Sequence, residues 1–290
     1  AHQQNIIPVV DLAIKEASIN IEDIDAIAYT KGPGLLGSLL VGGSFAKGFS
    51  SGLGIPLIEV NHMHAHILAH KIDGNNPKNS KPNFPFLCLT VSGGHTQIVK
   101  VDSPTSMKII GQTLDDAAGE AFDKVAKIIG LPYPGGPLVD KYSRKGNKLK
   151  YSFPKSKVDK LNFSFSGLKT AFLYFIRKKT QENTNFIDKN LHDICASIQY
   201  TIVSTLLDKL HRAVIETGIT EIAIAGGVSA NSSLRKTLQE LGEENNWEIF
   251  IPKFEYCTDN AAMIGIAGMY KYKEKKFASL SSKPEARLSF

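Results

Sequence analysis

The stretch Ile24–His66, IDAIAYTKGPGLLGSLLVGGSFAKGFSSGLGIPLIEVNHMHAH, decides how the first part of the chain folds. It begins as an apolar strand at 24–29, turns through a Gly-Pro-Gly sequence, and continues as an apolar helix from Leu35 to about Ser51. A second strand at 56–60 leads into a helix that carries several histidines. Because strands alternate with helices, the stretch predicts a mainly parallel sheet covered by helices, an α/β fold.

Two histidines in this last helix form a candidate metal site. His62 and His66 lie four residues apart, so both imidazoles share one helix face and can bind the same ion. Imidazole binds zinc, iron, copper and nickel, so the pair does not name the element. The alternative is a solvated helix face, because His64 and His70 lie on the same stretch. A zincin protease is a poor match, because its H-E-x-x-H motif needs Glu where this chain has Met63.

The composition is that of an ordinary globular protein, with 290 residues, 42% of them hydrophobic and 21% charged. No run approaches the roughly 18 apolar residues of a membrane span, and no signal peptide opens the chain. Cys88, Cys195 and Cys257 are far apart, odd in number and without a C-x-x-C pair. These features are typical of a cytoplasmic protein with reduced thiols.

The rest of the chain predicts a second lobe. A linker rich in Asn, Lys and Pro at 74–85 interrupts the strand–helix alternation, and two strands at 86–91 and 96–101 form a hairpin. Strand–helix units then return, so we expect two α/β lobes with a nucleotide cleft between them. The predicted boundaries are 1–84 with the last helix at 259–276 for the first lobe, 85–258 for the second, and 277–290 for a tail.

Three Gly-Gly pairs punctuate the predicted strands and helices. They lie in V-S-G-G-H-T at 91–96, in Y-P-G-G-P at 133–137 and in G-G-V-S-A-N at 226–231. Glycine lets the backbone approach a ligand closely, and a helix that follows such a loop offers free N–H groups to an anion. One Gly-Gly pair alone is more often a plain tight turn. Three in one chain favour a nucleotide site.

Carboxylates surround the same loops. Glu120 and Asp123 share one face of a predicted helix, and Asp140 follows the 133–137 turn, within reach of a ribose hydroxyl. Asp259 is expected to open the last helix, where N-capping explains it without any ligand. Two imidazoles and one carboxylate also suit Fe(II), or zinc with a bound water. Spacing alone does not bring Asp259 to the histidines.

A basic segment lies between Lys141 and Lys160, with eight Lys and Arg residues against a single acid. Its central members are Lys145, Lys148, Lys150, Tyr151 and Lys155. Such a segment can neutralise phosphates and stack on bases, as binding of single-stranded RNA requires. The alternative is a solvated loop that keeps the protein soluble.

Seven motifs, in order along the chain, resemble the TsaD family. They are N-H-M-x-x-H, V-S-G-G-H-T-Q, D-D-A-A-G-E-A-F-D-K, Y-P-G-G-P, F-S-F-S-G-L-K-T, G-G-V-S-A-N and C-T-D-N-A-A-M-I. Members of this family place threonylcarbamoyl on adenosine 37 of tRNA and are related to the universal subunit of the KEOPS complex. Motifs of this length do not recur by chance in one order.

The resemblance implies an actin–Hsp70–hexokinase type of fold, with two lobes around a nucleotide cleft. It also implies one metal ion per chain, Fe(II) with zinc as a common substitute. The implied ligands, which act in catalysis through the metal, are His62, His66 and Asp259. The residues implied to contact the substrate are Thr90, Val91, Ser92, Gly93, Gly94, Asp123, Gly136, Asp140 and Asn231.

The resemblance further implies that the chain transfers threonylcarbamoyl from threonylcarbamoyl-AMP to N6 of adenosine 37, in tRNAs that read codons beginning with adenine. Implied partners are a TsaB-like paralogue and a TsaE-like ATPase. A small-molecule kinase of the same fold and a non-catalytic scaffold stay open as alternatives. Family members begin with a strand and an acidic, Ser-rich phosphate-loop turn before the segment matching 1–4. Either this sequence is a fragment of a longer chain, or the first lobe lacks its opening strands.

The helix at 1–16 is a candidate docking face for such a partner. Ile6, Ile7, Val10 and Ile14 recur on it at helical spacing. Burial within the helix's own lobe explains the same spacing.

Overall fold

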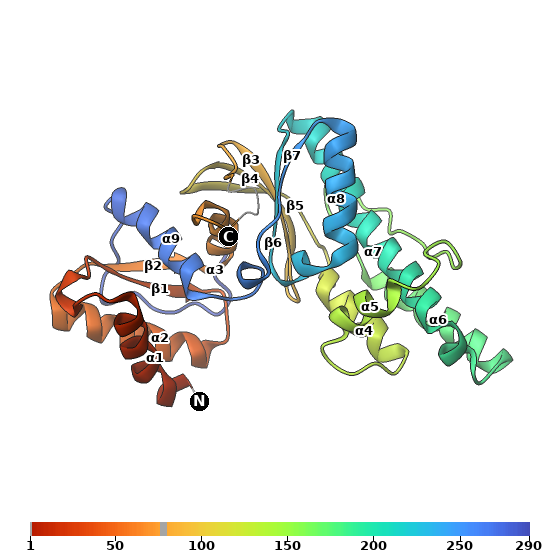
Figure 1. The fold of residues 1–290 in the computed structure, drawn as a ribbon, viewed down its shortest axis with the longest axis horizontal. Coiled ribbons are helices and arrows are strands. Elements are labelled where there is room, and N and C mark those ends of the chain that lie inside the picture. Colours follow the sequence, from red (N-terminus) through yellow and green to blue (C-terminus); the bar gives the residue numbers. More distant parts are fainter. Residues whose placement is uncertain (1, 76–79) are drawn as a thin grey trace. The chain divides into compact units, whose positions relative to one another are not determined.

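The computed structural model describes residues 2–75 and 80–290 (Figure 1). The chain divides into two compact units, unit 1 with residues 1–73 and 259–290, and unit 2 with residues 74–258. The linker predicted at 74–85 falls in part on residues 76–79, outside the described residues. Among the residues that are described, no helix combines the length and the apolar character that crossing a membrane requires.

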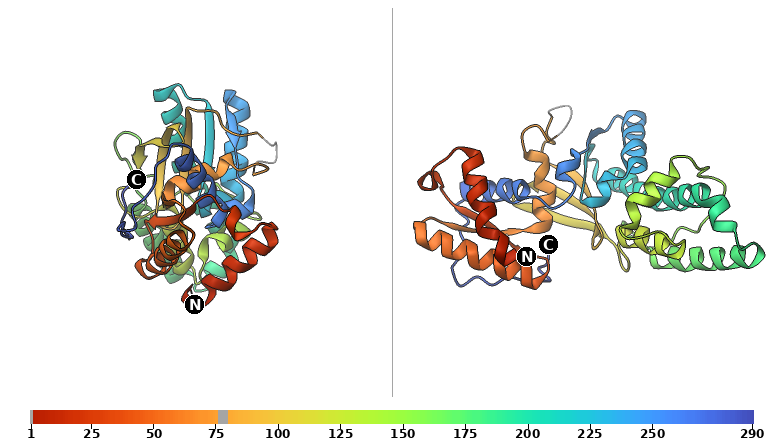
Figure 2. Two further views of the ribbon diagram at one scale, coloured as in Figure 1. Left: turned by 90° about the vertical axis from the view of Figure 1, so that its left-hand side faces the viewer. Right: turned by 60° about the horizontal axis from the view of Figure 1, so that its bottom comes forward.

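Unit 1 is built on two parallel strands, β1 (Ile27–Gly32) and β2 (Leu57–Asn61). The helix α2 (Leu36–Leu53) connects them and ends at Gly54, whose φ of 67° is readily adopted by glycine. The first helix, α1 (His2–Ala17), packs against α2 and crosses it (Figure 2). Two further helices follow, α3 (His62–Leu68) directly after β2 and α9 (Ala261–Lys273) near the end of the chain.

Unit 2 contains a five-stranded sheet in the order β5-β4-β3-β6-β7. The strands β3 (Phe86–Val91), β4 (Thr96–Ser103) and β5 (Ser106–Gln112) are antiparallel, whereas β6 (Glu221–Ala225) and β7 (Glu248–Phe250) continue the sheet in parallel. All six residues of β3 are buried, which explains its uninterrupted apolar sequence at the centre of the sheet.

Five helices accompany this sheet. They are α4 (Ala118–Ile128), α5 (Gly135–Ser143), α6 (Ser166–Glu182), α7 (Phe186–Thr217) and α8 (Ser232–Asn245). The Y-P-G-G-P sequence is not a plain turn, because its two glycines begin α5. The carboxylate of Asp123 on α4 accepts hydrogen bonds from their N–H groups and so provides the cap that the local sequence lacks.

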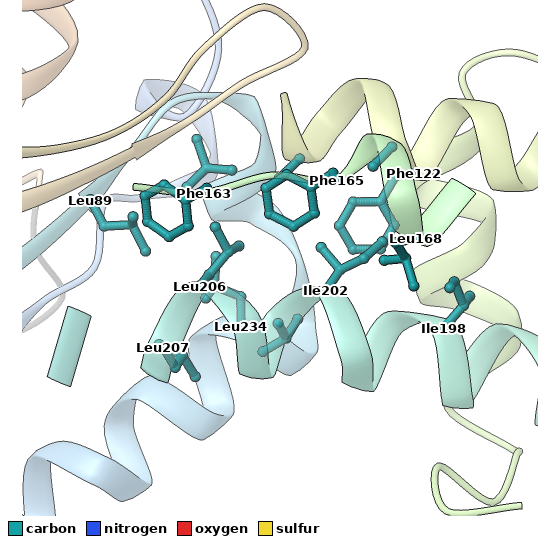
Figure 3. Close-up of a cluster of buried hydrophobic side chains, with 14 of the residues drawn as sticks. Leu89, Phe122, Phe163, Phe165, Leu168, Ile198, Ile202, Leu206, Leu207 and Leu234 are labelled. Atoms are coloured by element: carbon teal, nitrogen blue, oxygen red, sulfur yellow. The ribbon is translucent and has the colours of Figure 1, made fainter. Parts of the chain in front are cut away.

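The main hydrophobic core belongs to unit 2 and centres on α7 (Figure 3). Ile198, Ile202 and Leu206 recur at intervals of four on one face of this helix and are fully buried. The rings of Phe163 and Phe165 pack over that face, with centroids 6.4 Å apart and planes 13° from parallel. Burying a side chain of this size contributes about 1.5–3 kcal/mol.

Replacing Phe163 by Ala should therefore lower the free energy of unfolding of unit 2 by about 3–5 kcal/mol, since a cavity remains. The single tryptophan, Trp247, packs against the same core, so its fluorescence in urea reports on this unit. The control Tyr174→Ala removes an exposed ring from α6 and should change stability by less than about 0.5 kcal/mol. Equal urea midpoints for Phe163→Ala and the parent would contradict this description of the core.

Candidate functional site

The metal-binding candidates in unit 1 are positioned by the junction of β2 and α3. Asn61, the last residue of the strand, caps the helix, because its Oδ1 accepts hydrogen bonds from Met63 N at 2.9 Å and His64 N at 3.4 Å. The helix consequently begins at His62, and His66 follows one turn later on the same face.

One carboxylate oxygen meets both imidazoles. Asp259 Oδ1 lies 3.3 Å from His62 Nε2 and 3.2 Å from His66 Nε2. The two rings are perpendicular, with centroids 4.7 Å apart, and the three ligand atoms all lie within 4.8 Å of one another. The structure thus brings together three residues that the sequence could not connect by spacing.

Asp259 is free to do this because it does not cap the last helix, contrary to the expectation from sequence. The N-cap of α9 is Asn260, whose Oδ1 accepts from Met263 N at 2.8 Å. Contacts with His62 and then with His66 hold the pKa of Asp259 well below its ordinary value and outweigh the opposing effect of burial. The carboxylate is therefore ionised at neutral pH, as a metal ligand must be.

The donor set fits a divalent metal ion. The His66 side chain is 6% exposed and that of His62 is 21% exposed, whereas the Asp259 side chain is 80% exposed. Two imidazoles and one carboxylate, open on one side, leave coordination positions for water or substrate. His62 and Asp259 also line a largely apolar cavity of about 1140 Å³ in unit 1.

The alternative of a solvated histidine face is wrong. His66 and His70 are buried, and burial, with a smaller contribution from Lys271, lowers the pKa of His64 to about 4. A row of hydrated imidazoles would not have this environment.

The loops predicted to bind substrate all belong to unit 2, and two of them touch. β3 ends at Val91, where the Ser92 hydroxyl accepts hydrogen bonds from Gly94 N and His95 N at 3.4 and 3.0 Å. Gly226 has a φ of 87°, and a Cβ built there would lie 2.5 Å from the Val91 carbonyl oxygen. Only glycine fits this close approach, so the two glycine loops meet at the end of the central strand.

Asp140 and Asn231 lie in one buried polar cluster. Asp140 accepts hydrogen bonds from Ser232 Oγ at 2.7 Å and Arg144 Nη2 at 3.0 Å. Asn231 caps α8 and donates to Gln199 Oε1 at 2.8 Å. Gln199 is a residue that the sequence analysis missed, although a lone amide on the apolar face of α7 was a usable signal.

A second missed residue, Asp115, binds the start of α6. Its Oδ2 accepts from the hydroxyls of Ser164 and Ser166 at 2.6 and 2.8 Å, and its Oδ1 accepts from Phe165 N at 2.8 Å. Burial alone would raise the pKa of Asp115, but these hydrogen bonds outweigh it and lower the pKa. The hydrogen bonds of Asp115 thus connect the segment that carries the D-D-A-A-G-E motif to the segment that carries the F-S-F-S-G motif.

The basic segment carries less free charge than its sequence indicates. Lys150 pairs with Asp193 at 2.7 Å, and Lys155 pairs with Asp208 at 2.6 Å. The ring of Tyr151 packs against Phe175 in the core, with centroids 5.0 Å apart, so it does not present the open face that stacking on a base needs.

Asp259→Asn should remove stoichiometric metal binding, because the neutral amide loses the charge that compensates the ion. Elemental analysis after anaerobic purification should find about one equivalent of metal in the parent and much less in the variant. The control is Asp11→Asn on α1 of the same unit, where the exposed carboxylate pairs only with Lys15 in the described part of the chain. Full metal content in Asp259→Asn would remove Asp259 from the ligand set.

Asp115→Asn should destabilise unit 2 at pH 7 by about 1.5–3 kcal/mol, the typical contribution of a hydrogen bond to a charged group. Because the folded-state pKa of Asp115 is lowered, its contribution is present above the unfolded value near 3.9 and is lost as pH falls through the folded value. Urea unfolding at pH 7, 4 and 3 should therefore show a shrinking difference from the parent. Asp102→Asn, which removes an exposed partner of Lys100, is the control. A difference that does not change with pH would reject this role.

Comparison with known proteins places the fold. Two HypF structures, one full-length in the phosphate- and nucleotide-bound form and one from T. kodakarensis, match with TM-scores of 0.64 and 0.63. They cover 92 and 94% of this chain, which spans 41 and 44% of theirs, at 16 and 14% identity. At such identity the likeness concerns the fold alone, and it confirms the predicted α/β fold.

Sequence comparison is more specific. Residues 1–266 match the family model TsaD, tRNA N6-adenosine threonylcarbamoyltransferase. A protein of that name from Christiangramia forsetii is 61% identical over 290 residues, which are 100% of this chain and 85% of the relative. Its namesake from Cytophaga hutchinsonii is 57% identical over 288 residues, or 99 and 82% of the two chains. The chain belongs to the TsaD family of tRNA N6-adenosine threonylcarbamoyltransferases.

Proposed function

We propose that the chain transfers threonylcarbamoyl from threonylcarbamoyl-AMP to N6 of adenosine 37 in tRNAs that read codons beginning with adenine. The observation that carries this proposal is family membership along nearly the whole chain, at more than half identity to its relatives. The intact His62, His66 and Asp259 group supports it further, since a scaffold has no need of a metal-ligand set. Neither a sugar kinase nor a scaffold is favoured by these relatives.

His62, His66 and Asp259 would hold the metal, which we propose to be Fe(II), with zinc as a substitute. An ion bound there supplies a Lewis acid for the carbamoyl carbonyl. The chain's own contribution is to fix two ligands on a capped helix and to leave the Asp259 side open to substrate. Iron rests on the family resemblance, because the donor set alone suits both elements.

The loops of unit 2 would hold the adenylate. The residues proposed to contact it are Thr90, Val91, Ser92, Gly93, Gly94, Asp123, Gly136, Asp140 and Asn231. Apart from the adjacent residues in the chain, no atom of the described residues lies within 4 Å of a Cβ built on Gly93 or Gly94, so a ligand has room to approach this backbone. Each Asp140 oxygen accepts one hydrogen bond inside the protein and keeps a second lone pair for a ribose hydroxyl.

The acceptor amine is proposed to attack the carbamoyl carbon directly. A bond forms between N6 and that carbon, AMP leaves with the electrons of the broken C–O bond, and N6 loses a proton. An intermediate on Cys195 or Cys88 is disfavoured, because burial raises the pKa of Cys195 to about 12 and also raises that of Cys88. Neither thiol forms the thiolate that nucleophilic attack needs.

Partners are proposed on two surfaces. Ile6, Val10 and Ile14 of α1 are partly buried, and Ile6 and Val10 line the cavity of unit 1, so burial within the unit accounts for part of the apolar spacing. Ile7, Val9 and Leu12 are exposed. We propose these exposed apolar side chains as contacts for a TsaB-like paralogue, with a TsaE-like ATPase completing a cytoplasmic assembly. tRNA phosphates would contact Lys145 and Lys148 of the basic segment.

His62→Ala should abolish transfer, with rates reduced at least about 10³-fold if the metal supplies several kcal/mol. The assay contains anaerobic iron-loaded protein with its partners, threonylcarbamoyl-AMP and tRNA, and the modified nucleoside is measured by mass spectrometry. Circular dichroism should show an unchanged fold, and Asp102→Asn, an exposed change in unit 2, should retain the parent rate. Full activity of folded His62→Ala would contradict the proposal, whereas ATP-dependent phosphorylation of a sugar with no dependence on a transition metal would favour a kinase.

A further inference from the structure

The tail, residues 277–290, is packed along the two strands of unit 1. Ala278 N donates a hydrogen bond to Leu57 O at 2.7 Å, and Glu285 N donates to Lys31 O at 2.9 Å. A Cβ at Gly32 would collide with the Glu285 carbonyl, so glycine permits this close approach.

A polar cluster anchors the middle of the tail to the sheet. Ser282 Oγ donates to Glu59 Oε2 at 2.5 Å and lies 3.2 Å from the hydroxyl of Tyr29. Lys31 Nζ lies 3.2 Å from a carboxylate oxygen of both Glu59 on β2 and Glu285 on the tail. Lys31 and Glu59 are partly buried, and separating the tail would remove the Glu285 carboxylate from Lys31 and the Ser282 hydroxyl from Glu59.

The far end of the tail reaches the metal helix. The side-chain amide of Asn61 makes two contacts. Its Oδ1 caps α3, and its Nδ2 donates a hydrogen bond to Ser289 O at 2.9 Å. The ring of Phe290 packs on that of His64, with centroids 4.4 Å apart. His64 stands between the two proposed ligands in the sequence, so the tail touches both the cap and the middle of α3.

We propose that the tail positions α3 and thereby sets the geometry of His62 and His66 for metal binding, with Asn61 and Phe290 as positioning residues. This inference rests on the metal site of the proposed function. A helix of seven residues is unstable by itself in water, so its cap and its packing determine how precisely it is held. Groups that orient metal ligands typically account for about 10- to 100-fold in metal affinity.

The test uses Asn61→Ser and Phe290→Ala in the full chain. Serine keeps an oxygen that caps a helix but loses the amide that binds Ser289, and neither change adds a charge near the metal. Each variant should weaken Co(II) binding about tenfold in competition with a chromophoric chelator. The loss of Co(II) affinity in the double variant should be smaller than the product of the two single-variant fold-changes, because both residues act through one end of the tail. Leu280→Ala, an exposed change elsewhere in the tail, should bind as the parent does.

Hydrogen exchange separates positioning from general stability. Amides of α3 should exchange faster in Asn61→Ser and Phe290→Ala, while those of β3 in unit 2 stay unchanged. Co(II) affinities within twofold of the parent in both variants would overturn the proposal, whether or not α3 exchanges faster. If the parent binds Co(II) and the variants weaken as expected but no nucleoside is modified, the transfer function fails and the positioning role stands.

Discussion

The contact of Asp259 Oδ1 with two imidazoles is the interaction on which the candidate site depends. It joins α3 to the segment before α9, and His66 and Asp259 are separated by 193 positions in the chain. Two asparagines make it possible, because Asn61 begins α3 at His62 and Asn260 caps α9 in place of Asp259. Without either cap, the three ligand atoms would have no reason to converge.

In unit 2, the polar side chains proposed to contact substrate also hold the protein together. Asp123 caps α5, and Asn231 caps α8 while binding Gln199. Each of these groups is held in place before a ligand arrives, which lowers the cost of ordering it on binding. Substitution at such a position therefore affects folding as well as binding, and the two effects must be measured separately.

The sequence predicts the bounds of a strand or helix well where the signal lies within that element. It predicts them poorly where a residue far away in the chain determines where the element begins. The apolar run of β3 was predicted with the bounds that the structure has, but β1 begins at Ile27 and not at Ile24, because β2 supplies a partner only from there. The helix α5 was missed, since its cap comes from Asp123 on another helix.

The same distinction holds for the site. The i, i+4 spacing predicted the histidine pair, whereas neighbouring Asp259 and Asn260 are both good N-caps and the sequence could not choose between them. Resemblance to the TsaD family connected Asp259 to the histidines, and the geometry agrees with it. Gln199 and Asp115 are missed from sequence because their roles arise from contacts between segments far apart in the chain.

The central claim is a metal centre made of two imidazoles and one carboxylate in a threonylcarbamoyltransferase. X-ray absorption spectroscopy of the anaerobically loaded protein tests it most directly. We expect a shell of nitrogen and oxygen atoms that includes two imidazoles, with metal–nitrogen distances of about 2.0–2.1 Å if the ion is zinc. Sulfur in that shell, or a shell without imidazole scattering, would contradict the account.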